Sequence, residues 1–75
     1  MDKLMEILIG IRPDLDFENE TKLIDDSLLD SFDIISIVGE INSEFDISIN
    51  AADLKNENFN SANAIWELVQ DHKTR

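Results

Sequence analysis

Apolar residues recur at spacings of three and four in three segments of the chain, and this periodicity predicts three amphipathic helices. The first covers about residues 2–11 and ends before Pro13, because the residue before a proline is pushed out of the helical region. The second runs from about Ser31 or Phe32 to Glu44, and the third from Asn60 or Ser61 to about His72. Their inward-facing residues are expected to be Leu4, Ile7, Leu8 and Ile11; Ile34, Ile37, Val38, Ile41 and Phe45; and Ala62, Ile65, Trp66, Leu68 and Val69.

The segments between these helices predict how they are connected. Residues 12–30 form a connection that is long for a compact domain, and its regularly placed apolar residues indicate an ordered loop that packs onto the helices. Residues 46–49 alternate like a strand, but no second strand exists to pair with them, so we expect an extended connector. Asn50 then caps a short helical turn from 51 to about 55, and residues 56–60 have turn composition. The pattern predicts an all-α domain of four helices, with a short third helix.

Composition narrows the function. The chain has 75 residues, which allows one small domain over 1–75, and it has 6 basic against 17 acidic residues, for a formal net charge of -11. Such acidity argues against nucleic acid and anionic membranes, and it favours basic partner surfaces. The absence of cysteine excludes disulfides and any thiol of the chain's own. Neither a signal peptide nor an apolar run long enough for a membrane span is apparent, so we expect a cytoplasmic location without membrane insertion.

Catalytic and metal-binding patterns are weak. Ser31 has only carboxylates near it in sequence, and the single histidine, His72, lies towards what we expect to be a fraying helix end. No glycine-rich phosphate loop and no His/Cys cluster occurs. Asp14, Asp16 and Glu18 are spaced somewhat like a calcium loop, but Asn19 stands where that loop needs glycine. We therefore predict no catalytic residue and no specific metal site.

Ser31 stands where a loop rich in turn residues meets the second helix, and two interpretations are open. The serine hydroxyl could cap the helix by accepting from a free N–H of its first turn. Alternatively, a hydroxyl at this junction is reachable by another enzyme and well placed to carry a phosphodiester, because a helix N-terminus favours an anion.

The sequence Asp30-Ser31-Phe32-Asp33, followed by Ile-Ile-Ser-Ile-Val and later by Glu44-Phe45-Asp46-Ile47, resembles the acyl and peptidyl carrier protein family. The resemblance covers essentially the whole chain. It implies a four-helix bundle of the acyl-carrier type that is not an enzyme. It also implies a 4′-phosphopantetheine arm, taken from coenzyme A and attached to Ser31, whose thiol holds acyl or aminoacyl groups as thioesters and carries them between enzymes.

The same resemblance implies partners. These are holo-acyl-carrier-protein synthase or another phosphopantetheinyl transferase, and an acyl or aminoacyl ligase or an acyltransferase; the carrier itself is expected to be a monomer. By resemblance Asp30 is the carboxylate that the modifying synthase recognises. Phe32 and Ile35 fall outside the main apolar stripe, so they are candidates for partner contact. Asp33, Glu40 and Glu44 are weaker candidates for partner recognition.

Details of the motif distinguish branches of the family. Leu28-Leu29-Asp30-Ser31 is more similar to D-alanyl carrier proteins, which serve the D-alanylation of cell-wall polymers, and to stand-alone carriers of specialised pathways. Ser36, Asn42 and Ser43 occupy positions that are often acidic in carriers of fatty acid biosynthesis, which disfavours that branch of lipid metabolism without excluding it. An alternative from another class also stays open: an acidic helical interaction module that is never modified, in which Ser31 is only a cap.

Overall fold

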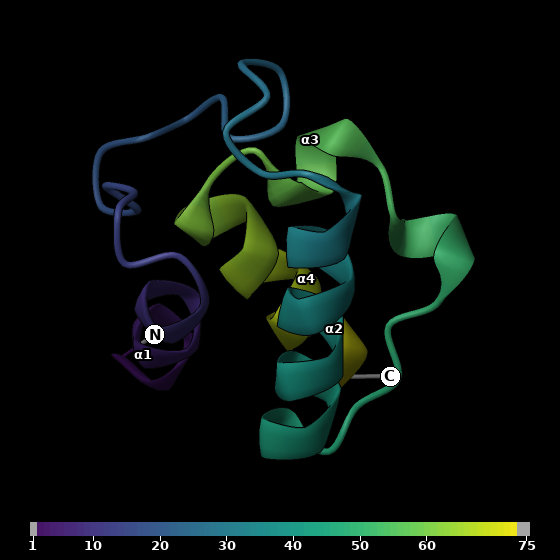
Figure 1. The fold of residues 1–75 in the computed structure, drawn as a ribbon. Coiled ribbons are helices and arrows are strands. Elements are labelled where there is room, and N and C mark those ends of the chain that lie inside the picture. Colours follow the sequence, from purple (N-terminus) through teal and green to yellow (C-terminus); the bar gives the residue numbers. More distant parts are fainter. Residues whose placement is uncertain (1, 74–75) are drawn as a thin grey trace.

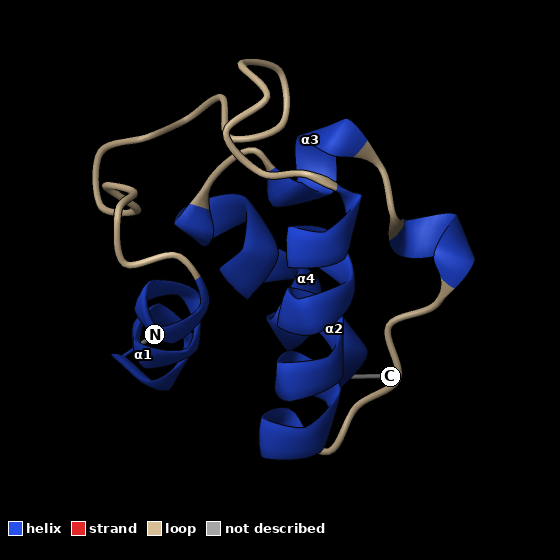
Figure 2. Cartoon of the chain, in the orientation of Figure 1, coloured by secondary structure: helices blue, strands red, loops and turns tan. Residues whose placement is uncertain are grey.

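The computed structural model describes residues 2–73, and all regular structure in this part of the chain is helical (Figure 2). The helices are α1 (Asp2–Ile11), α2 (Ser31–Phe45), α3 (Asn56–Phe59) and α4 (Ala62–Lys73), with a 3-10 turn, η1 (Ala51–Asp53). The predicted all-α class, with four helices, a short third helix and a long loop between the first two, is confirmed. None of the helices within 2–73 combines the length and hydropathy that a membrane span requires.

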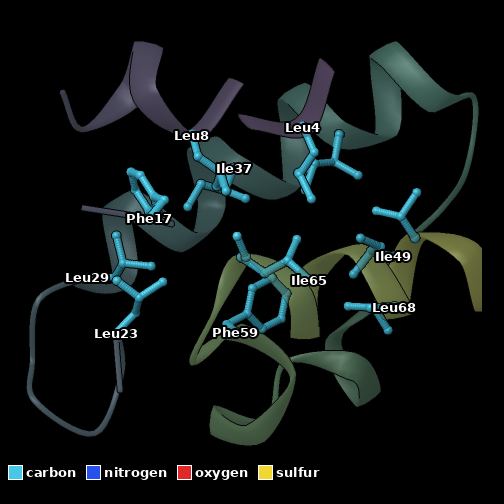
Figure 3. Packing of buried hydrophobic residues seen from close by; sticks show 13 residues of the cluster. Leu4, Leu8, Phe17, Leu23, Leu29, Ile37, Ile49, Phe59, Ile65 and Leu68 are labelled. Atoms are coloured by element: carbon cyan, nitrogen blue, oxygen red, sulfur yellow. The ribbon is translucent and has the colours of Figure 1, made fainter. Parts of the chain in front are cut away.

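Helices α1, α2 and α4 pack against one another, and α3 covers one end of α4 (Figure 1). The predicted apolar stripes meet in one core, where Leu4, Leu8, Ile37, Ile41, Ile65 and Val69 are fully buried (Figure 3). Trp66 packs at the edge of this core, with its ring edge-on to Phe45 at 5.9 Å between centroids. Burial of these side chains supplies the main force that holds the small bundle together.

The long loop over 12–30 is part of the core, as its apolar residues predict. Phe17, Leu23 and Leu29 are buried. The backbone N–H of Leu23 donates to the carbonyl of Asn60 at 2.9 Å, and the Asn60 side-chain oxygen accepts from the N–H groups of Ile24 and Asp25 at 3.0 and 3.1 Å. Because these contacts join segments far apart in the sequence, the loop reaches α2 along a fixed path.

The prediction was right for the first part of the segment between α2 and α4 and wrong for the second. Asn50 does cap the turn at η1, since its side-chain oxygen accepts from the N–H of Ala52 at 2.9 Å. However, the short α-helix lies over Asn56–Phe59, in a segment predicted to be a turn. Phe59 is almost fully buried, and closing a helical turn places its ring in the core despite the poor helix propensity of asparagine. Ser61 caps α4, accepting from the N–H of Ala64 at 3.0 Å.

His72 also differs from expectation. Its side chain is only 8% exposed, and its Nε2 lies 2.9 Å from Oδ2 of Asp53. The last turn of α4 is therefore tied to η1 rather than loose, and this contact fixes the segment that leads into α3.

Candidate functional site

The N-terminus of α2 is closed by two aspartates that cap it reciprocally. Asp30 precedes the helix in an extended conformation, and its carboxylate accepts from the backbone N–H of Asp33 at 2.9 Å. Asp33 Oδ2 accepts in return from the backbone N–H of Asp30 at 3.2 Å. This arrangement is a capping box in which aspartate replaces the usual glutamate. The interpretation of Ser31 as the N-cap is therefore wrong.

Ser31 is the first residue of α2 and is exposed to solvent. Among residues 2–73, no side chain or backbone group forms a hydrogen bond with its hydroxyl. Because Asp30 already serves the first turn, the Ser31 oxygen has no structural duty and stays available for chemistry at a helix terminus that favours anions.

Arg12 holds this junction from the end of α1. Its Nη1 donates to Asp33 Oδ2 at 2.6 Å and to the carbonyl of Leu28 at 3.0 Å. Its Nε and Nη2 form a bidentate pair with Asp14 at 3.0 and 2.9 Å. One guanidinium thus connects α1, the last residues of the loop and the first turn of α2, a geometry that lysine could not reproduce.

These contacts also affect protonation. The hydrogen bonds from Arg12 lower the pKa of Asp14. The carboxylates of Asp14 and Asp33 in turn raise the pKa of Arg12. A carboxyl group with a lowered pKa in the folded state contributes stability that is complete above its ordinary pKa. That contribution is lost as the pH falls through the lowered pKa of Asp14, so the pair of Arg12 with Asp14 weakens only in acid.

Ser31 lies on the border of an open pocket of about 520 Å³. Most of the lining is apolar and comes from the end of the long loop, from α2 and from the region of α3; it includes Ile24, Leu29, Ile34, Leu54 and Phe59. Asp30 and Lys55 are the charged residues at this pocket. A group attached to Ser31 would therefore have both water and an apolar surface within reach.

Large apolar side chains are exposed beside the serine. Phe32 is 81% exposed and Ile35 is 66% exposed, and Ile35 lines the pocket together with the half-exposed Leu54. Well-packed monomers rarely leave such residues together in water without a function.

A family model described as the phosphopantetheine attachment site matches residues 2–69. The D-alanyl carrier protein of Lactococcus lactis subsp. lactis (strain IL1403) is 36% identical over 62 residues, which are 83% of this chain and 73% of that protein. The chain belongs to the phosphopantetheine-binding carrier protein family. A comparison with solved structures found no match.

The family assignment confirms the resemblance noted in the sequence. Within that family, the chain is nearer to the D-alanyl carriers. The carrier domain is a non-catalytic protein whose cofactor is covalently bound 4′-phosphopantetheine. The described part of the chain has residues that fit such a group: an exposed hydroxyl that forms no hydrogen bond within this part, next to a pocket with apolar walls.

The structure brings some of the predicted site residues together and separates others. Asp30 and Ile35 line the same pocket as Ser31, and Phe32, the next residue of α2, is exposed. Glu40 lies about 180° from Ser31 around the helix axis, at 100° per residue. Glu44, further along that face, is 3.5 Å from Lys3 of α1.

Asp33 is less available than its sequence position suggests. Its side chain is 15% exposed and is held by Arg12 and by the backbone of Asp30. The contribution of Asp33 to partner recognition remains a prediction. In the structure, the Asp33 carboxylate has a structural role at the start of α2.

Two residues near the site escaped sequence reasoning. Arg12 reaches a carboxylate 21 positions away, and the only local signal was its spacing from Asp14. Lys55 borders the pocket from the segment before α3, 24 positions after Ser31, and nothing in its sequence neighbourhood indicates that approach.

Substitutions at Asp30 separate its role as a helix cap from the role of its negative charge. Asparagine keeps an oxygen for the Asp33 N–H, so Asp30→Asn should change the free energy of unfolding by less than about 0.5 kcal/mol, whereas Asp30→Ala should cost about 1 kcal/mol. If a transferase recognises the charge, both variants should lose about tenfold in kcat/KM for modification. Denaturant unfolding and a modification assay measure the two effects. Wild-type modification of Asp30→Asn would show that Asp30 acts only as a cap.

Proposed function

We propose that Ser31 is the attachment point of the 4′-phosphopantetheine arm and that the carrier domain transports D-alanine as a thioester on that arm. The single observation that supports the attachment point is the exposed Ser31 hydroxyl, which the Asp30–Asp33 capping box leaves without a hydrogen-bond partner among residues 2–73. The cargo is suggested by the similarity to a protein named as a D-alanyl carrier and by the Leu28-Leu29-Asp30-Ser31 segment.

The attachment reaction needs little from the carrier itself. The Ser31 oxygen forms a bond to the phosphorus that bears the pantetheine, and the bond from that phosphorus to the remaining nucleotide of coenzyme A breaks. The serine proton passes to a base of the transferase, because the carrier offers no histidine near Ser31. When bound, the arm supplies the thiol that this cysteine-free chain lacks.

Partner contact in this proposal centres on the start of α2. Asp30 presents a negative charge to a basic transferase, and the exposed Phe32 and Ile35 supply apolar contact area to the transferase and the ligase. Glu40, Glu44 and Asp33 play a smaller part. The net charge of -11 speeds the approach of basic partners. Monomeric state and cytoplasmic location remain predictions from the sequence.

A fatty-acyl cargo is the second candidate, and the apolar lining of the pocket at Ser31 favours it. A pocket of about 520 Å³ offers an aliphatic chain a place out of water. D-alanine is small and carries an ammonium group, so it gains little from such walls.

Modification by coenzyme A and a phosphopantetheinyl transferase tests the attachment point. Intact-mass spectrometry should show the addition of one phosphopantetheine group to the wild type and to Ser36→Ala, a matched change of an exposed serine on the same helix. Ser31→Ala should gain none. Addition to Ser31→Ala would place the site elsewhere, and no addition to the wild type would support the unmodified interaction module.

Loading of the holo carrier tests the cargo. A D-alanine ligase with ATP should charge the thiol with D-alanine at least about tenfold faster than a fatty-acyl ligase charges it with a fatty acid, a difference of about 1.4 kcal/mol in the barrier. Mass spectrometry of the thioester and its release by hydroxylamine provide the measurement. Preferential fatty-acyl loading would instead support the second candidate.

A further inference from the structure

Three of the five lysine and arginine residues in the described part of the chain already contact an anion or an aromatic ring. Lys3 and Arg12 form ion pairs with carboxylates, and Lys73 lies over an aromatic ring, 5.6 Å from its centroid. Within the described range 2–73, Lys22 and Lys55 are the basic side chains that form neither an ion pair nor a cation–π contact. Each of these two ammonium groups is therefore free to meet an anion from outside the chain.

Only one of the two is placed at the serine. Lys55 borders the pocket that Ser31 also lines, whereas Lys22 does not. The backbone of Lys55 is fixed, because its N–H donates to the carbonyl of Asp53 and its own carbonyl accepts from the N–H of Asn58, both at 2.9 Å. The side chain therefore starts from a defined position in the lining of the pocket.

Modification of Ser31 creates an electrostatic problem that this lysine can reduce. A phosphodiester adds a negative charge to a protein whose formal net charge is already -11, directly after Asp30 and two residues before Asp33. The start of α2 attracts an anion, but the capping box has already taken the N–H of Asp33. A cation on the pocket rim lowers the cost of the added charge.

We propose that the ammonium group of Lys55 pairs with the phosphodiester formed on Ser31 and so stabilises the modified carrier relative to the unmodified one. Lys55 is then a positioning residue that holds the base of the arm at the mouth of the pocket. This inference rests on the proposed attachment at Ser31 and adds to it a residue from the other wall of the pocket.

The test compares unmodified and modified forms of the wild type, Lys55→Gln and Lys22→Gln, each checked for complete modification by mass spectrometry. Modification should raise the thermal midpoint of the wild type and of Lys22→Gln by about 1–6 °C more than that of Lys55→Gln. The difference should fade between about 0.01 M and about 1 M salt, where the screening length falls from about 30 Å to about 3 Å. The ³¹P resonance of the phosphodiester should also shift in Lys55→Gln alone.

Three results would overturn the inference. Equal midpoint changes in all three proteins would show that Lys55 does not sense the phosphodiester. A lower modification rate of Lys55→Gln, with unchanged midpoint differences and ³¹P shift, would make Lys55 a contact of the transferase instead. Failure of the wild type to gain any mass would remove the attachment site itself, and this inference with it.

Discussion

The presentation of Ser31 depends on the hydrogen bonds that the guanidinium of Arg12 donates. This guanidinium contacts Asp14 at the start of the loop, the carbonyl of Leu28 at the end of the loop, and Asp33 in the first turn of α2. Without it, the long loop would still bury its leucines, but the start of α2 would lack a cross-link to α1. With it, Asp33 is oriented to complete the capping box, and Asp30 takes the role that a serine at this position often fills. The freedom of the Ser31 hydroxyl is a consequence of what its neighbours do.

This division of labour suits a carrier. The chain contains no cysteine, so in this carrier family the thiol has to come from the attached cofactor. The protein contributes a reachable hydroxyl, an adjacent apolar pocket and an exposed surface at Phe32 and Ile35. The junction held by Arg12 supports all three features, and in the proposed role it keeps the serine in a reproducible position for partner enzymes.

The sequence was sufficient for the three longer helices but not for α3 or for the contacts that connect the helices. Leu8, Ile37 and Ile65 follow the helical period, and burial of the apolar residues at that spacing determines how the bundle packs. The position of α3 was predicted wrongly because Asn56–Phe59 has poor helix propensity, and only the burial of Phe59 in the finished core compensates for it. The contact of His72 with Asp53 joins residues 19 positions apart, so no local pattern could indicate it.

The candidate site shows the same limit. Family resemblance singled out Ser31 and Asp30 as candidates, and the helical period singled out Phe32 and Ile35 as apolar residues outside the core stripe. The capping box was readable in principle, because Asp33 stands three residues after Asp30. The approach of Arg12 and of Lys55 depends on how the loop and the α3 segment fold back over α2, which is tertiary information.

The unfolding free energy of unmodified Ser31→Ala tests most directly whether the serine is free of structural duty. Because Asp30 caps the helix, the substitution should change stability in a denaturant titration by less than about 0.5 kcal/mol, as at other exposed positions. A loss of about 1 kcal/mol, the usual cost of removing an N-cap, would mean that the serine itself holds the helix end and would contradict this account.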